Sequence, residues 1–204
     1  MSDFYKYEDS DYIYTDPKTG VLRNLAHITD PDALLFFESV AVTKRIKELY
    51  EKPIKINGAD SLLAIHRHLF QDVYSWAGKK RKVEISKEGK QFFPTTHFDN
   101  AFHFIDTLIS DYRNISKEDK LQLAEKLAEI LDTVNYLHPF REGNGRTQRE
   151  FLRLLALEKG LILNLNPPDN KSVYDRYMQG TINSDIKTLT KLILELICTQ
   201  NDTK

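Results

Sequence analysis

The stretch that most restricts the fold is REFLRLLALEKGLIL, residues 149–163, which is apolar on nearly every side when it is drawn as a helix. A helix of this kind is unfavourable at a surface, because it would expose an apolar face to water. We therefore expect it to be central, with the other elements packed around it. A chain of 204 residues is long enough to build such a core.

Most of the remaining segments also have apolar residues at helical spacing. Six further helices are expected, over residues 29–52, 58–78, 96–112, 116–137, 171–181 and 185–199. The buried stripes expected for three of them are Leu34, Leu35, Val42, Ile46 and Leu49, then Leu62, Ile65, Leu69 and Val73, and then Leu123, Leu127, Ile130, Leu131 and Val134.

Residues typical of helix ends support these limits. Asp30 or Thr29 can cap the first helix, and Pro31 falls in its first turn, where proline is tolerated. Ser116 is the expected cap of the helix that precedes residue 138, and Gly78 is expected to end the second helix.

One segment has the pattern of a β-hairpin. RKVEISKEGKQFF, residues 81–93, predicts two short strands around the turn residues 87–89, and we call residues 82–93 the flap. No other segment has a convincing strand pattern. The prediction is an all-α helical bundle with a small β-hairpin flap: an N-terminal arm over 1–28, a single domain over 29–200 and a tail over 201–204.

Composition excludes several classes of protein. The chain is 41% hydrophobic and 29% charged, and its net charge of −1 gives no overall basic field for nucleic acid. The basic run over 78–87 is interpreted as a solvated edge that protects the flap strands. The single cysteine, Cys198, excludes an internal disulfide. Residues 1–14 do not resemble a secretory signal, and no run approaches the roughly 18 apolar residues of a membrane span.

The segment HPFREGNGRTQR, residues 138–149, concentrates the groups that carry chemistry. It joins the end of one expected helix to the start of the central one, and Pro139 suits that break. The glycines at 143 and 145 permit backbone conformations that other residues avoid. Unbonded N–H groups at a helix start form a site for an anion.

The charged residues of this segment are consistent with a bound polyphosphate. Arg146 opposes the helix dipole, and Arg149 lies on the same side one turn later, an arrangement that makes sense if both bind phosphate oxygens. Glu142 suits such a site if it holds a divalent cation that bridges those oxygens. His138 can accept a proton near neutral pH. The alternative, a capped loop whose charges pair with each other, explains any one residue better than it explains the set.

Other motifs give weaker signals. The chain has no GxxxxGK[ST] loop and no Rossmann fingerprint. His66 and His68 are two residues apart on an expected helix, so we interpret them as surface or packing residues rather than a metal pair.

At every specified position, residues 138–149 match the Fic signature, His-x-Phe-x-(Asp/Glu)-Gly-Asn-Gly-Arg-x-x-Arg. YSWAGKKR, residues 74–81, is similar to the segment that precedes the flap in Fic proteins, and the order of elements over about 30–198 is also similar. The resemblance implies transfer of AMP from ATP to a tyrosine, threonine or serine hydroxyl of a target protein.

The resemblance also implies a role for each residue of the site. His138 would be the catalytic base, Glu142 would hold Mg²⁺, and Phe140 would face the core. The nucleotide phosphates would lie on Gly143, Asn144, Gly145, Arg146 and Arg149, with Arg146 at the β-phosphate and Arg149 at the γ-phosphate. The flap residues expected to dock the target are Val83, Glu84, Ile85, Phe92 and Phe93.

Several alternatives remain open within the resemblance. Gly145 fits the adenylylating branch, since the kinase-like Doc branch has lysine there, while phosphocholine transfer and a non-catalytic binding module are the other options. The inhibitory segment (Ser/Thr)-x-x-x-Glu-(Gly/Asn) of many Fic proteins has only poor matches, at 95–100 and 190–195. We therefore expect either no self-inhibition or a separate small antitoxin. The resemblance suggests a type II topoisomerase as a possible target. The expected location is the cytoplasm or an injected host cell. We expect the protein to contact neither a membrane nor nucleic acid directly.

Overall fold

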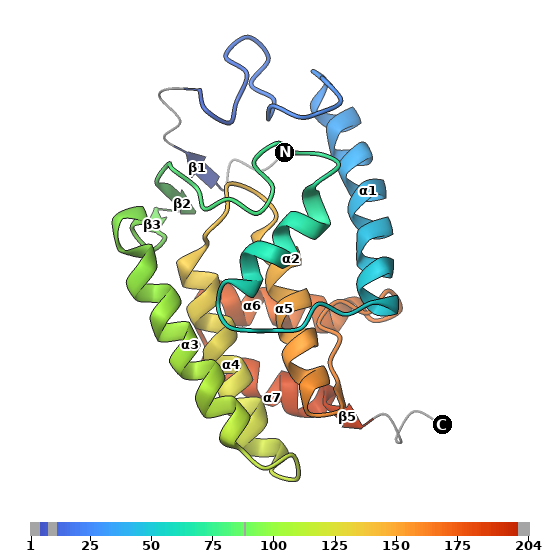
Figure 1. The fold of residues 1–204 in the computed structure, drawn as a ribbon, viewed down its shortest axis with the longest axis vertical. Helices are drawn as coiled ribbons and strands as arrows, with labels where there is room; N and C mark the ends of the chain where they lie inside the picture. Colours follow the sequence, from blue (N-terminus) through green and yellow to red (C-terminus); the bar gives the residue numbers. More distant parts are fainter. Residues whose placement is uncertain (1–4, 8–11, 88, 200–204) are drawn as a thin grey trace.

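The computed structural model describes residues 5–7, 12–87 and 89–199 and has a helical fold with α5 at its centre (Figure 1). Its helices are α1 (Pro31–Glu51), α2 (Ser61–Phe70), α3 (Phe98–Asn114), α4 (Lys120–Leu137), α5 (Asn144–Glu158), α6 (Lys171–Asn183) and α7 (Ile186–Leu196). As expected, α5 is central: the side chains of Phe151, Leu152 and Leu155 are fully buried. None of the helices in the described part of the chain is long and apolar enough to cross a membrane.

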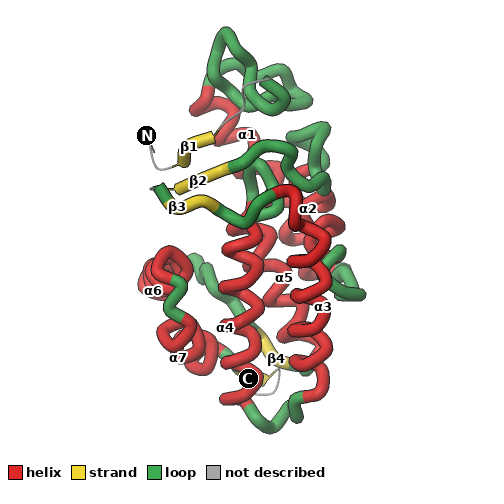
Figure 2. Tube along the Cα trace, turned by 90° about the vertical axis from the view of Figure 1, so that its left-hand side faces the viewer, coloured by secondary structure: helices red, strands yellow, loops and turns green. Residues whose placement is uncertain are grey.

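The flap forms as expected, but it is not the only β structure. Strands β2 (Ile85–Lys87) and β3 (Lys90–Gln91) pair antiparallel, and β1 (Tyr5–Tyr7) pairs antiparallel with β2; the three strands lie side by side in yellow in Figure 2. A second pair joins β4 (Leu161–Ile162) to β5 (Cys198–Thr199). Runs of two or three residues are too short to give a strand period, which is why the sequence did not reveal β1, β4 or β5. Glu88 of the expected turn and residues 200–204 lie outside the described part of the chain.

Several helix limits differ from the expected ones. The central helix was expected to reach residue 163, but α5 ends at Glu158, and residues 161–162 form β4 instead. Helix α2 ends at Phe70 rather than Gly78, and turns that bury Val73 follow it. Helix α4 begins later than Ser116, because Asp119 accepts the Gln122 N–H as its cap. Helix α7 ends at Leu196, since the residues after it pair with β4. The expected cap of α1 is confirmed: Asp30 accepts the Ala33 N–H at 2.7 Å.

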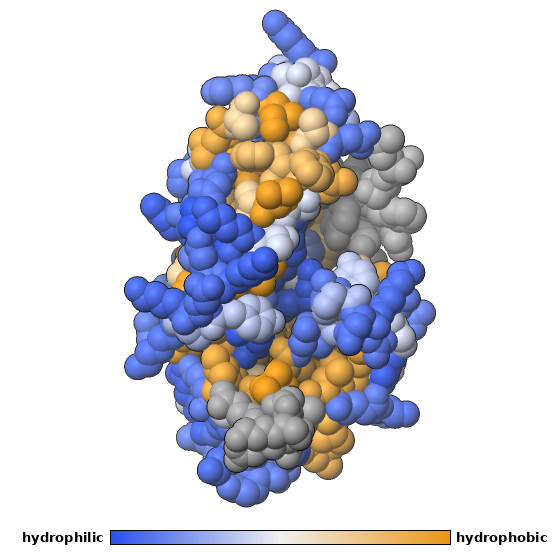
Figure 3. All heavy atoms as spheres, turned by 90° about the vertical axis from the view of Figure 1, so that its right-hand side faces the viewer, coloured by the Kyte–Doolittle hydropathy of each residue, from blue (hydrophilic) through white to orange (hydrophobic). Residues whose placement is uncertain are grey.

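Helix α1 has an unusual distribution of polarity. Leu34, Val42 and Leu49 are buried. Leu35 was also expected in the buried stripe, but it is 65% exposed, and Phe36 and Val40 are exposed to a similar degree. Hydrophobic side chains therefore gather on the outer face of this region, in the upper half of Figure 3. Glu38 lies in the middle of the buried stripe, one turn from both Leu34 and Val42.

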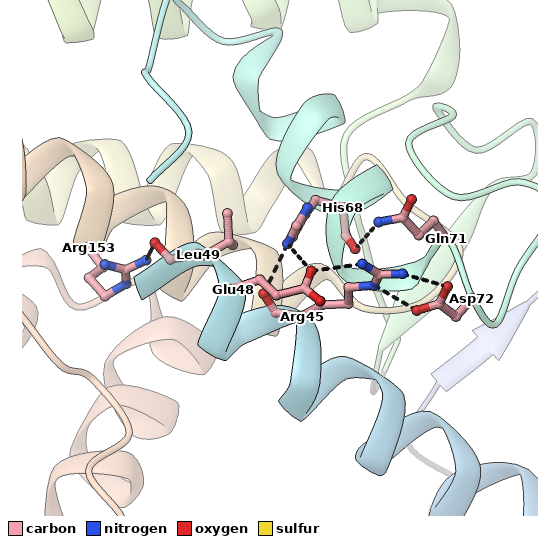
Figure 4. A network of polar contacts seen from close by, with 7 residues as sticks. All are labelled: Arg45, Glu48, Leu49, His68, Gln71, Asp72 and Arg153. Atoms are coloured by element: carbon pink, nitrogen blue, oxygen red, sulfur yellow. Dashed lines mark hydrogen bonds and ion pairs between the residues drawn. The ribbon is translucent and has the colours of Figure 1, made fainter. Parts of the chain in front are cut away.

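A polar network clamps α1 to the end of α2 (Figure 4). The Arg45 guanidinium donates to both carboxylate oxygens of Asp72 at 2.7 and 2.8 Å and to Glu48 at 2.8 Å. The imidazole of His68 reaches the Arg45 carbonyl oxygen at 3.0 Å. Two-pronged contacts of this kind fix the relative position of two helices.

The imidazole of His66 faces the opposite way and supports the loop between α4 and α5. Its Nδ1 accepts the Gly78 N–H at 2.8 Å, so Nε2 carries the proton and donates to the Glu142 carbonyl oxygen at 3.0 Å. The ring also stacks on Phe140 with centroids 3.8 Å apart. His66 and His68 thus hydrogen-bond to different segments, which agrees with their interpretation as surface or packing residues.

Burial of His66 makes the fold sensitive to acid. Burial lowers the pKa of His66 to about 3, far below the value near 6.5 in an unfolded chain. The unfolded state therefore binds an extra proton between these values, and stability falls as the pH is lowered from about 6.5 towards 3. We expect this group to remove about 2 kcal/mol of unfolding free energy between pH 7 and pH 5.

Urea unfolding of wild type and His66→Gln at both pH values measures this loss. The variant should lack the His66 part of the pH-dependent loss, whatever its stability at pH 7. Arg67→Gln, at an exposed position of the same helix, is the matched control and should keep the wild-type change in unfolding free energy between the two pH values. If His66→Gln loses as much unfolding free energy between pH 7 and pH 5 as wild type does, His66 is not buried as a neutral group.

Candidate active site

The loop between α4 and α5 is closed by its own side chains. The Asn144 amide accepts the Phe140 N–H at 3.0 Å and donates to the Phe140 carbonyl oxygen at 2.8 Å, so both ends of this amide are used within the loop. Gly143 has φ +82°, and a Cβ there would lie 2.3 Å from the Phe70 ring. Both the backbone conformation and the space at position 143 therefore require glycine.

Arg81 fastens this loop to the flap. Its Nε donates to the His138 carbonyl oxygen at 2.9 Å, and its two terminal nitrogens donate to the carbonyl oxygens of Val83 and Phe93 at 2.6 Å each. The residue is only 2% exposed. The interpretation of the whole basic run over 78–87 as a solvated edge was thus wrong at Arg81, because buried carbonyl groups there need a donor.

The start of α5 presents N–H groups to one surface of the loop. The first bond within the helix runs from the Thr147 N–H to the Gly143 carbonyl oxygen at 3.1 Å, so the N–H groups of residues 144–146 precede it. The Arg149 guanidinium lies 5.5 Å from the ring centres of Tyr174 and Tyr177. Arg146 lies over the Phe70 ring at 4.8 Å. Positive charge and N–H groups therefore converge on one helix end, which suits an anion.

His138 lies at the other end of the loop, in a left-handed conformation with φ +44°. Its Nδ1 is 3.1 Å from the Asn135 carbonyl oxygen, which can only accept, so Nδ1 carries a proton. In the neutral ring the basic lone pair is then on Nε2. The Phe92 ring stacks on the imidazole with centroids 3.8 Å apart, which leaves His138 7% exposed.

The Glu142 carboxylate lies between these two ends. Its Oε1 accepts the Gly143 N–H at 2.9 Å and lies 3.4 Å from Arg146 Nη2, and the side chain is 39% exposed. Among the described residues there is no group of three histidine, cysteine, aspartate or glutamate side chains that would cage a metal. The donor set therefore fits a hard cation such as Mg²⁺ that takes one carboxylate from a protein and its other oxygens from phosphate and water.

The five flap residues expected to dock a target mostly face inward. Val83 and Ile85 are 7% and 3% exposed, and Phe92 and Phe93 are partly buried against the core. The Glu84 carboxylate accepts the N–H and the hydroxyl of Thr95, at 2.9 and 2.6 Å. Of the five, only Glu84 is exposed, so the apolar side chains of the flap are turned mainly toward the protein.

Four residues of the site had no assigned role in the sequence analysis: Glu38, His66, Tyr74 and Arg81. Three of the four lie in expected helices. The contacts that Glu38, His66 and Arg81 make with the loop and the first turn of α5 bridge 57 to 108 residues of the chain. Only Glu38 had a usable signal, since an acid within a buried apolar stripe needs a partner.

Comparison with known proteins supports one family. The Fic/DOC family model matches residues 56–156. Protein adenylyltransferase VbhT of Bartonella schoenbuchensis is 39% identical over 76% of this chain, which spans only 33% of that relative's length. Probable protein adenylyltransferase y4lH of Sinorhizobium fredii is 32% identical over 88% of this chain, and the match covers 91% of the length of y4lH.

Comparison with solved structures finds the same fold. The crystal structure of BepC, a VirB-translocated effector protein of Bartonella tribocorum with bound AMPPNP, superposes with a TM-score of 0.79 over 93% of this chain and 98% of that one, at 20% identity. The fold, the loop and the relatives agree with the sequence resemblance. The chain belongs to the Fic/DOC family.

Proposed function

We propose that this chain is a protein adenylyltransferase that moves AMP from ATP to a hydroxyl side chain of a target protein. The observation that carries the proposal is that one loop holds an imidazole base at one end and an arginine-lined helix N-terminus at the other. The relatives named as adenylyltransferases support it, including y4lH, of which this chain spans nearly the whole length.

The groups of the loop account for each part of this reaction. The target hydroxyl oxygen attacks the α-phosphorus of ATP, its proton passes to His138 Nε2, and the bond to pyrophosphate breaks. The tautomer set by Asn135 supports this role, because it places the basic lone pair on Nε2. The N–H groups of α5 and the two arginines stabilise charge on the phosphates. Glu142 would hold Mg²⁺, which neutralises phosphate charge when it is bound.

The flap is the proposed dock for the target. Its inward-facing side chains favour recognition by strand addition, in which backbone groups give affinity. Strand β1 covers one edge of β2, so the edge of β3 is the one that we assign to the target. This edge leads into Phe92, which lies against His138.

We also propose that control comes from a separate chain. In the two segments that partly match the inhibitory sequence, Asp99 pairs with Lys80 and Glu195 pairs with Arg176, so each acid is paired with a residue other than Arg149. A small antitoxin and a type II topoisomerase target are the partners that the family resemblance suggests, and the cytoplasm or an injected host cell is the corresponding location.

Label transfer from ATP into a bacterial lysate tests the reaction. Label at the α-phosphorus should enter a protein band in the presence of Mg²⁺, while label at the γ-phosphorus should not. His138→Ala should reduce transfer by roughly 10²- to 10⁴-fold, because the base is lost. His103→Ala, which removes an exposed histidine from α3, is the control and should transfer normally.

Three results would contradict the proposal. Transfer from the γ position would indicate a kinase. Transfer that survives in His138→Ala would remove the base from the mechanism. Label from choline-bearing nucleotides in place of ATP would indicate a phosphocholine transferase on the same fold.

The role of Glu142 predicts a specific metal dependence. Glu142→Gln should raise the Mg²⁺ concentration needed for half-maximal transfer on the order of tenfold or more, since the amide is a weaker ligand. Titration of Mg²⁺ after treatment with EDTA measures this shift. Glu125→Gln, an exposed acid on α4, should titrate like wild type. An unchanged curve for Glu142→Gln would assign the metal to other ligands.

A further inference from the structure

Glu38 is a charged side chain in a place where the fold calls for an apolar one. It is 4% exposed and lies in the buried stripe of α1, with Leu34 and Val42 one turn to either side. Placing a carboxylate there costs free energy unless partners satisfy its charge and its lone pairs. On the opposite face of the same helix, the apolar side chains of Phe36 and Val40 are exposed. The helix therefore has apolar residues at exposed positions while a charged residue is buried.

Two partners satisfy the Glu38 carboxylate, and they come from different segments. The Tyr74 hydroxyl donates to Oε2 through a short hydrogen bond. Arg146 Nη2 lies 2.6 Å from Oε1. Burial and the neighbouring carboxylate raise the pKa of Tyr74, so its hydroxyl stays protonated and remains a donor. Tyr74 is itself fixed by stacking on Trp76 at 4.2 Å.

The Arg146 guanidinium is thereby held on three sides. Glu38 and Glu142 both contact Nη2, at 2.6 and 3.4 Å, and the Phe70 ring lies 4.8 Å from the guanidinium carbon. Both ion pairs have their contact at the same nitrogen, Nη2. An arginine has five N–H donors in a rigid fork, so fixing one prong also sets the direction of the others.

Stability alone does not explain this arrangement. A buried ion pair is often no more stable than well-packed apolar residues of the same size, because desolvation of two charges offsets their attraction. A leucine at position 38 would continue the stripe of α1. The benefit of Glu38 is instead geometric, since it connects α1 to the first turn of the helix that carries the phosphate-binding groups.

We propose that Glu38, held by Tyr74, is a positioning residue that aims the Arg146 guanidinium at the β-phosphate of the nucleotide. This inference rests on the proposed function, which places the polyphosphate at the start of α5. Glu38 does not itself touch the nucleotide in this arrangement. Its effect is therefore specific to ligands that carry a β-phosphate.

Binding of ADP and AMP, measured by calorimetry without any transfer reaction, isolates that effect. Wild type should bind ADP more tightly than AMP. Glu38→Gln should weaken ADP binding roughly tenfold and leave AMP binding unchanged, because only ADP reaches Arg146. Tyr74→Phe, which keeps the stacked ring and removes the hydroxyl, should move ADP binding in the same direction by less. If Glu38→Gln fails to fold, as judged by thermal unfolding, the Tyr74→Phe result decides.

Three further variants separate positioning from a merely structural role. Glu150→Gln removes another buried acid, 7% exposed and paired with Arg153 at 2.8 Å, and should bind both nucleotides like wild type. Arg146→Ala should lose ADP affinity, and adding Glu38→Gln to it should cause no further loss, since the two residues act through one contact.

Each outcome has a separate meaning. If wild type does not distinguish ADP from AMP, the proposed phosphate site is wrong. If wild type does distinguish them and Glu38→Gln keeps the full difference, Glu38 does not position Arg146. Tighter ADP binding by Glu38→Gln would also overturn the inference, because Glu38 would then compete with the phosphate for Arg146.

Discussion

The stack of the Phe140 ring on the buried imidazole of His66 is the contact on which the site depends. The loop between α4 and α5 spans only residues 138–143, so much of what holds it comes from other segments of the chain. Phe140 anchors the loop through its stack on His66, and the His66 Nε2–H donates to the Glu142 carbonyl oxygen at the same time. A neutral, buried histidine is suited to this task, because it supplies an aromatic face and one directed donor.

The same loop is held from three further directions, and each contact comes from a different part of the chain. Arg81 fixes its first carbonyl and joins it to both sides of the flap. Glu38 reaches its far end through Arg146. Asn144 closes it internally. These contacts fix the loop that carries the proposed chemistry before a ligand binds, which reduces the reorganisation needed when a charged ligand binds.

Sequence patterns predicted the parts of this fold that repeat along the chain. The stripe from Leu123 to Val134 is fully buried, α5 is central, and the cap at Asp30 is as expected, because each depends on near neighbours. The signature residues of the loop are local in the same sense. What could not be predicted depends on contacts between distant segments. Arg81 is of a residue type that usually lies at the surface. It is buried here because the carbonyl groups of His138 and Phe93 meet it together with that of the nearby Val83. Strands β4 and β5 form from pairs too short to have a period.

A crystal structure with Mg²⁺ and a non-hydrolysable ATP analogue tests the central claim most directly, namely that the loop is already arranged for a polyphosphate. The phosphates should lie on the N–H groups at the start of α5, with Arg146 still paired to Glu38 and with loop Cα atoms shifted by about 1 Å or less. A nucleotide bound elsewhere would contradict the account. So would a loop that must break the Phe140–His66 stack or the Glu38–Arg146 pair before the phosphates can bind.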